Sequence, residues 1–132
     1  MARFVIDISS AVRILEHGTV ISPDHEILAP TLLRSQVLDH LYQQVRRGDL
    51  TEENALSLNS RFAKLKFRYL GDAVLRRRAW TVAKSRGLPS TLDAEYIALT
   101  QLQADALVAS DEKLAKIARL AVDVRPFEAI EA

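Results

Sequence analysis

Short apolar runs, separated by longer segments of helical periodicity, constrain the fold of this 132-residue chain more than any other feature. Each run is too short for a helix and is typical of a buried strand. The segments between the runs repeat apolar residues at helical spacing, as Leu33, Val37 and Leu41 do. The predicted strands are residues 3–7, 27–30, 106–109 and 121–124.

Helix start and stop signals lie between these runs. Ser9 or Ser10 begins a first helix that Gly18 can end. Pro30 suits the first position of a second helix, which ends near Gly48.

The middle of the chain is predicted to be mainly helical. Thr51 is the expected cap of a helix in residues 50–67, and a second helix covers residues 72–87. Further helices are expected at about 93–103 and 111–119. Apolar residues expected to pack in the middle helices are Leu56, Phe62, Leu65, Val74, Leu75, Trp80 and Val82.

Strands separated by helices of this length imply right-handed crossovers and a mostly parallel sheet covered on both sides. We therefore predict one α/β domain, residues 1–132, built as a three-layer α/β/α sandwich with a central, mostly parallel sheet. In such sheets, ligands bind beyond the carboxyl ends of the strands.

Composition excludes several kinds of site. The chain has no cysteine, so disulfides, thiolate nucleophiles and cysteine zinc sites are excluded. Its three histidines show no i, i+4 pair, so any bound metal is expected to have oxygen ligands. No apolar run approaches the roughly 20 residues that span a bilayer, and we expect a cytoplasmic protein with no membrane contact.

Charge is unevenly distributed along the chain. Residues 61–86 hold nine basic residues and one acid, a net charge of +8, and since the whole chain carries +1, the remainder carries −7. This pattern fits a nucleic-acid contact surface set against an acidic region, and it equally fits a solvated basic helix face.

Three acids stand at equivalent places in the predicted topology. Asp7 ends the first strand, Asp111 follows the strand at 106–109, and Asp93 begins a helix. Each alone is explained as a helix-capping residue, and Asp93 has the spacing of a capping box that begins at Ser90. Strand carboxyl ends and helix amino ends share one edge of a parallel sheet, so the three acids are expected to converge.

Converging carboxylates repel one another unless a cation neutralises them. A hard divalent ion such as Mg2+ prefers oxygen ligands and is often held by one or two carboxylates together with substrate phosphates. Such an ion can activate water for attack on a phosphodiester. The pattern therefore predicts metal-assisted phosphodiester hydrolysis.

Three segments stand in a characteristic order along the chain. They are "FVIDISSAV", with its D-x-S element at Asp7, Ile8 and Ser9, "LAPTLLRSQVLDHL", and "TLDAEYIALTQLQADALVASDEKLAK", which supplies Asp93 and Asp111. This ordered set resembles one known family, the PIN-domain ribonucleases, and within it the VapC-type toxins of bacterial toxin–antitoxin pairs. The resemblance spans nearly the whole chain.

The resemblance implies a PIN-like fold and endonucleolytic cleavage of RNA with Mg2+ or Mn2+. Asp7, Asp93 and Asp111 would be the catalytic and metal-binding residues, and Ser9 would assist the site by hydrogen bonding. The family also implies a homodimer and a small antitoxin protein that inserts a C-terminal segment over the active site.

The chain departs from the family at Gln36, where a glutamate is usual. An amide keeps an oxygen that can face a metal-bound water, but it brings no negative charge and cannot act as a base. Metal affinity should therefore be lower. Asp39 lies three residues further on and could partly replace the charge, although a solvated surface acid is the plainer interpretation.

Other residues near these motifs are interpreted as structural. Glu95 and Glu112 adjoin the candidate acids but point elsewhere on their helices, so we predict surface positions for both. Tyr96 and Trp80 are expected to pack in the core or a dimer interface rather than to stack on bases. At most two of the arginines at 76–78 can serve one surface, since successive helical residues turn by about 100°.

Two further functions stay open at this stage. Gln36 favours a degenerate PIN module that binds RNA or a protein partner without cutting it. A flavodoxin-like or response-regulator-like domain would also gather aspartates at a sheet edge, but the helical middle interrupts the regular alternation that those folds need.

Overall fold

The computed structural model describes residues 1–132 and contains five strands, six α-helices and one short 3-10 helix, η1. In chain order they are β1 (Ala2–Ile6), α1 (Ile8–His17), β2 (His25–Pro30), α2 (Leu32–Arg46), α3 (Glu52–Ala63), β3 (Phe67–Leu70), α4 (Ala73–Arg86), α5 (Leu92–Gln103), β4 (Ala106–Val108), α6 (Glu112–Ala118), β5 (Val124–Arg125) and η1 (Phe127–Ile130). None of the helices combines the length and the apolar content that a membrane crossing requires.

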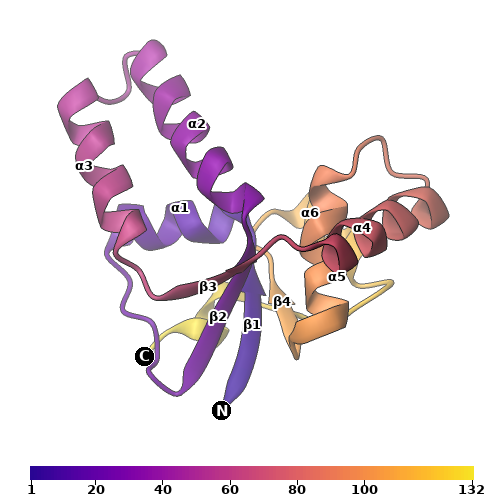
Figure 1. The fold of residues 1–132 in the computed structure, drawn as a ribbon. Helices are drawn as coiled ribbons and strands as arrows, with labels where there is room; N and C mark the ends of the chain where they lie inside the picture. The colour runs from indigo at the N-terminus through magenta and orange to yellow at the C-terminus, as the bar shows by residue number, and fades with distance from the viewer.

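All five strands form one parallel sheet in the order β3-β2-β1-β4-β5. Figure 1 shows the sheet between two groups of helices, with α1, α2 and α3 on one side and α4, α5 and α6 on the other. The predicted α/β/α sandwich with a parallel sheet is therefore confirmed. The chain runs from β1 to β2 in one direction and enters β4 on the other side of β1, so the strand order reverses between β1 and β4.

The hydrophobic core is one cluster of 30 buried residues that joins the sheet to both helical layers. Its centre is formed by β1 and β4, where Val5, Ile6 and Leu107 are fully buried. A strand buried on both faces is a continuous apolar run rather than an alternating one. This explains why β1 and β4 could be recognised in the sequence.

Strand β3 was missed by the sequence prediction, which placed residues up to 67 in a helix. Helix α3 ends at Ala63, and Phe67–Leu70 pairs with β2 at the edge of the sheet. An edge strand is only partly buried, so its apolar residues alternate with exposed ones such as Arg68. Pro30 was also misplaced: it ends β2 opposite Leu70, and Thr31 precedes α2.

Three of the predicted packing residues are exposed. Val74 and Trp80 lie on the outer surface of α4, and Leu56 lies on the outer surface of α3. Helix α4 packs instead through Leu75 and Val82, together with neighbouring alanines. The final strand begins at residue 124 rather than 121, because residues 119–122 form a turn after α6.

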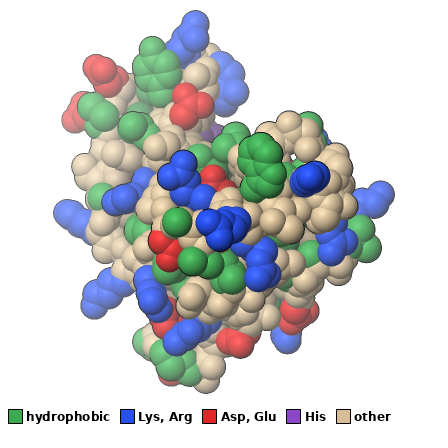
Figure 2. Space-filling view, turned by 45° about the vertical axis from the view of Figure 1, so that its right-hand side comes forward, with side chains coloured by type: hydrophobic (Ala, Val, Ile, Leu, Met, Phe, Trp, Pro, Cys, Tyr) green, Lys and Arg blue, Asp and Glu red, His purple; other side chains and the backbone are tan.

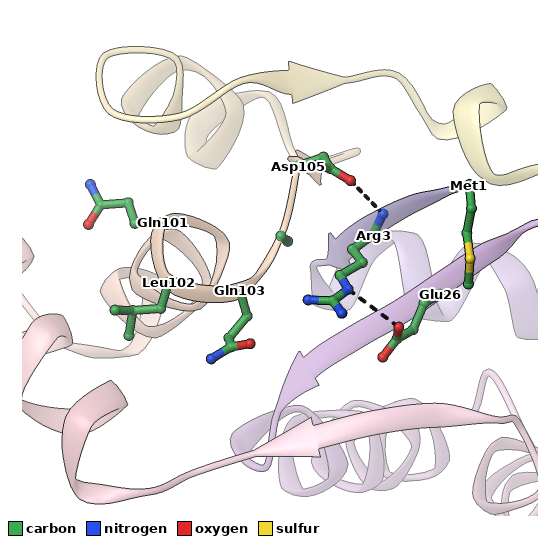
Figure 3. A pocket seen from close by; sticks show the side chains of 8 residues that line it. Met1, Arg3, Glu26, Gln101, Leu102, Gln103 and Asp105 are labelled. Carbon is green, nitrogen blue, oxygen red and sulfur yellow. Dashed lines mark hydrogen bonds and ion pairs between the residues drawn. The ribbon is translucent and has the colours of Figure 1, made fainter.

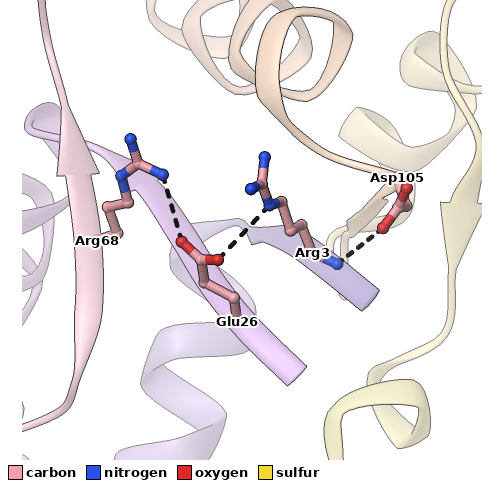
Figure 4. Close-up of polar contacts among 4 residues, drawn as sticks. All are labelled: Arg3, Glu26, Arg68 and Asp105. Atoms are coloured by element: carbon pink, nitrogen blue, oxygen red, sulfur yellow. Dashed lines mark hydrogen bonds and ion pairs between the residues drawn. The ribbon is translucent and has the colours of Figure 1, made fainter. Parts of the chain in front are cut away.

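Charged side chains tie the strands together at the amino edge of the sheet. Glu26 forms ion pairs with both Arg3 (Nε to Oε2, 3.5 Å) and Arg68 (Nη1 to Oε1, 3.4 Å), and the backbone N–H of Arg3 donates to Asp105 (2.8 Å), as Figure 4 shows. Arg3, Glu26 and Asp105 also line an open pocket of about 380 Å³ (Figure 3). Exposed ion pairs contribute at most about 1 kcal/mol each, and this edge lies opposite the three candidate acids.

Candidate active site at the carboxyl edge of the sheet

Asp7 follows β1 directly, and its carboxylate is buried. Oδ1 accepts from the backbone N–H of Ser10 (2.8 Å), and Oδ2 accepts from the hydroxyl of Ser9 (2.8 Å). The backbone N–H groups of Ser110 and Asp111 approach the same two oxygens at 3.4 and 3.3 Å. Asp7 therefore caps α1, as one interpretation predicted, and also holds the segment that follows β4. No lysine or arginine pairs with this buried carboxylate.

Asp111 is exposed at the amino end of α6. Its Oδ1 accepts from the backbone N–H of Lys113 (3.1 Å), so the capping interpretation holds here too. The adjoining Ser110 hydroxyl lies 2.9 Å from the hydroxyl of Ser10, which in turn donates to the carbonyl of Val108 (3.1 Å). Together with the Asp7 carboxylate, these hydroxyl contacts attach the loop after β4 to the start of α1.

Asp93 differs from the other two acids because it caps nothing. It lies half-buried in the first turn of α5, whose N-cap is Thr91, and the Ser90 hydroxyl accepts from the backbone N–H of Leu92 (3.3 Å). The capping box expected from Ser90 to Asp93 is therefore wrong. The Asp93 carboxylate has no hydrogen-bond or ion-pair partner in the protein.

Asp93 is influenced electrostatically by the other two acids. Burial raises the pKa of Asp93, the carboxylates of Asp111 and Asp7 raise it further, and Lys113 lowers it. These are the effects expected when like charges share a partly desolvated edge. The topology explains why these acids lie at one edge of the sheet. Asp7 follows β1 and Asp111 follows β4, and between these two strands the strand order reverses, which is where ligands commonly bind.

The acids do not close a complete ligand shell. No group of three or more His, Cys, Asp or Glu side chains lies close enough together to hold a metal ion by itself. The donor set nevertheless fits Mg2+ or Mn2+, because Mg2+ keeps several waters and needs only one or two carboxylates. The unpartnered Asp93 oxygens, facing two further carboxylates, are the atoms that a hydrated cation would neutralise.

Gln36 contacts Tyr96 at this edge. The Tyr96 ring is buried, as the packing prediction required, but its hydroxyl donates a hydrogen bond to the side-chain oxygen of Gln36. Burial raises the pKa of Tyr96, and the carboxylates of Asp7, Glu95 and Asp93 raise it further. The sequence prediction missed this polar role. The signal was present, since Tyr96 lies three residues after Asp93 and so shares its helical face.

The remaining acids near the motifs have separate environments. Burial raises the pKa of Glu95 and Arg76 lowers it, so Glu95 is not the plain surface residue that we predicted. Glu112 is exposed and pairs with Arg119 (3.1 Å), which confirms its surface position. Asp39 is exposed and accepts from Gln43 (3.4 Å), as expected of a solvated acid.

Three cations from three different helices contact or act on residues of this edge. The Arg34 guanidinium of α2 lies over the Tyr69 ring, 4.9 Å from its centre, Arg76 of α4 acts on Glu95, and Lys113 of α6 acts on Asp93. None of the three forms an ion pair. They are therefore available to an anionic ligand.

The basic segment 61–86 is spread over the molecular surface. Figure 2 shows many Lys and Arg side chains on the face that carries α4 and α5, with fewer acidic ones between them. Arg77 and Arg78 line one surface pocket together, whereas Arg76 faces Glu95. Two of the three consecutive arginines thus serve one surface, as predicted.

Comparison with solved structures identifies the fold. PAE2754 from Pyrobaculum aerophilum matches with a TM-score of 0.74 and 22% identity, over 92% of this chain and 89% of that one. VapBC-1 from nontypeable Haemophilus influenzae matches with a TM-score of 0.62 and 11% identity, over 95% of this chain and 98% of that one. The chain has the PIN-like fold.

A third match supports the same PIN-like fold. VapBC2 from Rickettsia felis, bound to a DNA fragment from their promoter, has a TM-score of 0.63 and 12% identity, over 94% of this chain and 98% of that one. No protein-family model and no curated protein matches the sequence. The family resemblance drawn from the three sequence segments is thus confirmed at the level of the fold.

Proposed function

We propose that this PIN-like protein is a Mg2+-dependent endoribonuclease and the toxin component of a toxin–antitoxin pair. The observation that carries the proposal is the unpartnered carboxylate of Asp93, whose pKa is raised by burial and by the carboxylates of Asp111 and Asp7 at the carboxyl edge of the sheet. Asp93 accepts no hydrogen bond and forms no ion pair, and Lys113 is the one cation that lowers its pKa. A partly buried carboxylate that lies among like charges suits a bound divalent cation.

In this proposal Asp7, Asp93 and Asp111 are the metal-binding and catalytic residues, and Mg2+ or Mn2+ is the ion. The bound ion would supply an activated water and stabilise the leaving oxygen. Ser9 donates to Asp7 and keeps its carboxylate oriented. The backbone donors around Asp7 hold the ends of β1 and β4 together, which preserves the spacing of the acids.

RNA is proposed as the substrate from the family resemblance, and the unpaired cations support a polyanion. Lys113 acts on Asp93 itself, whereas Arg76 acts on the neighbouring Glu95 and Arg34 lies over the Tyr69 ring. Lysine and arginine contacts to phosphates supply most of the sequence-independent affinity for nucleic acid. These residues would hold the backbone on either side of the scissile bond.

Protein partners are proposed for two exposed apolar surfaces. Leu38 and Leu56 border a groove between α2 and α3, and Val74 and Trp80 are exposed on α4. Exposed apolar patches of this kind are typical of protein interfaces. The structural likeness to two VapBC structures supports an antitoxin as one partner, and the family resemblance supports a second copy of the chain as the other.

The second candidate function is a degenerate PIN module that binds RNA or a protein with little or no cleavage. The contact between Gln36 and Tyr96 favours it, because the amide is neutral and its one acceptor oxygen is oriented by the Tyr96 hydroxyl. With glutamine at position 36, the edge has the carboxylates of Asp7, Asp93 and Asp111 but lacks the fourth carboxylate that a glutamate at this position would add.

The test is Mg2+-dependent cleavage of a panel of structured RNAs by the purified chain and three variants. Asp93→Asn removes the unpartnered carboxylate, and Asp24→Asn is a matched control because it makes the same change just before β2, at the opposite edge. The proposal expects cleavage by wild type and Asp24→Asn and none by Asp93→Asn. If wild type does not cleave and Gln36→Glu does, the degenerate module is the correct function.

A further inference from the structure

The contact between Tyr96 and Gln36 joins the two helices that flank the acidic edge. Tyr96 belongs to α5, three residues after Asp93, and Gln36 belongs to α2. The tyrosine is 1% exposed and its hydroxyl donates to the glutamine oxygen, 60 residues away in sequence. A buried hydroxyl with a single side-chain partner fixes the orientation of that partner.

The hydroxyl is a permanent donor in this environment. Burial, and then the carboxylates of Asp7, Glu95 and Asp93, raise the pKa of Tyr96, so the phenol keeps its proton at any pH that the protein meets. A phenol has one proton to donate. Since that proton goes to Gln36, the nearby carboxylates do not receive it.

The consequence for an ion depends on the side chain at position 36. The glutamine has one acceptor oxygen, one lone pair of which Tyr96 engages, and its amide nitrogen has no partner in the protein. It therefore offers N–H donors to the edge, where a hydrated cation needs acceptors. A glutamate would offer two oxygens, one held by the Tyr96 hydroxyl and the other free for the ion or its water.

We propose that Tyr96 is a positioning residue that sets the divalent-cation affinity of the acidic edge by orienting the side chain at position 36. With Gln36 it keeps the amide oxygen away from the ion, and with a carboxylate there it directs one oxygen toward the ion. The inference rests on the proposed metal site. Its distinctive expectation concerns the removal of the Tyr96 hydroxyl. This change should alter the affinity for the cation differently in the wild-type protein, which has Gln36, and in the variant Gln36→Glu.

The experiment is a titration with Mn2+ alone, measured by calorimetry and by electron paramagnetic resonance of the free ion. The proteins are wild type, Tyr96→Phe, Gln36→Glu and the double variant. Groups that orient a metal ligand typically change affinity about 10- to 100-fold when removed. We expect Tyr96→Phe to weaken Mn2+ binding by Gln36→Glu at least about tenfold and to change binding by wild type less than about threefold.

A purely structural role predicts another result. The loss of one buried hydrogen bond would lower the melting temperature of metal-free protein in both backgrounds, and any effect on Mn2+ affinity would be the same in both. Equal changes in affinity overturn the positioning role. So does an unaltered side-chain amide resonance of Gln36 in Tyr96→Phe, because the hydroxyl would then not hold the amide.

One further variant separates this inference from the proposed function. Asp93→Asn in the Gln36→Glu background removes the unpartnered carboxylate. If it abolishes Mn2+ binding while Tyr96→Phe acts equally in both backgrounds, the metal site stands and the positioning role fails. If none of the proteins binds Mn2+, the proposed metal site fails and the positioning role fails with it.

Discussion

The backbone N–H of Asp111 donates to the buried Oδ2 of Asp7 across 3.3 Å, although 104 residues separate the two in sequence. The contact holds the loop after β4 against the end of β1. Asp7 is therefore a structural residue as well as a candidate metal ligand. Substitutions of Asp7 will change both properties, whereas substitutions of Asp93 test the cation site more cleanly.

The variant Asp7→Asn should be less stable than wild type. An amide nitrogen at one oxygen position would face the donor of Ser9 or of Ser10 and leave it unsatisfied. An unsatisfied buried polar group costs about 1–3 kcal/mol. Urea denaturation without metal measures this loss, and an unchanged transition midpoint would show that the four donors do not depend on the carboxylate.

The variant Ser9→Ala should show a smaller loss. It removes one hydroxyl donor from Asp7 but leaves the Ser10 backbone donor in place. We expect a decrease of about 1 kcal/mol in the free energy of unfolding, together with weaker RNA cleavage. A variant with wild-type cleavage and stability would contradict the orienting role of Ser9.

The variant Asp93→Asn should gain stability at neutral pH in the absence of metal. The pKa of Asp93 is raised in the folded chain by burial and by Asp111, so the folded state keeps a proton that the unfolded state has released. Stability is then lost as pH rises from the ordinary aspartate pKa through the raised one.

Removing the carboxyl group should remove this loss. At pH values below the ordinary aspartate pKa, wild type and Asp93→Asn should have similar stability. At pH values above the raised pKa of Asp93, the variant should be the more stable of the two. Urea denaturation at a series of pH values measures the difference. A difference that does not vary with pH would show that Asp93 is not held among like charges.

The variant Gly71→Ala should be destabilised by a contact beyond the carboxyl end of β3. A Cβ atom at this position would lie 2.6 Å from Oγ1 of Thr31. Overpacking in a core costs about 1–3 kcal/mol, and because Thr31 and Gly71 are exposed we expect a loss at the lower end, about 1 kcal/mol. The variant Thr31→Ala removes the clashing atom, so the double variant should recover most of the loss, and simple additivity of the two changes would contradict the clash.

The sequence was sufficient to predict four of the five strands and the positions of Asp7 and Asp111 beyond β1 and β4, because both follow from topology. Fully buried strands such as β1 and β4 are continuous apolar runs, and an acid just after each run must lie at the carboxyl edge. Strand β3 was missed because an edge strand has neither a continuous apolar run nor a second partner.

Details within the site depended on packing that sequence patterns do not contain. The spacing from Ser90 to Asp93 suited a capping box, but α5 begins at Leu92 and leaves the carboxylate without a donor. Tyr96 was correctly predicted to be buried. Its polar contact with Gln36 depends on how α2 lies against α5, which periodicity within one helix does not determine.

The most direct test of the account is a crystal structure of the protein soaked in Mn2+, with anomalous scattering used to locate the ion. The account predicts one strong peak bonded to the Asp93 carboxylate, with the carboxylates of Asp7 and Asp111 reached directly or through one water. A saturated crystal with no peak at this edge, and with Asp93 still unliganded, would contradict the central claim that these three acids hold a divalent cation.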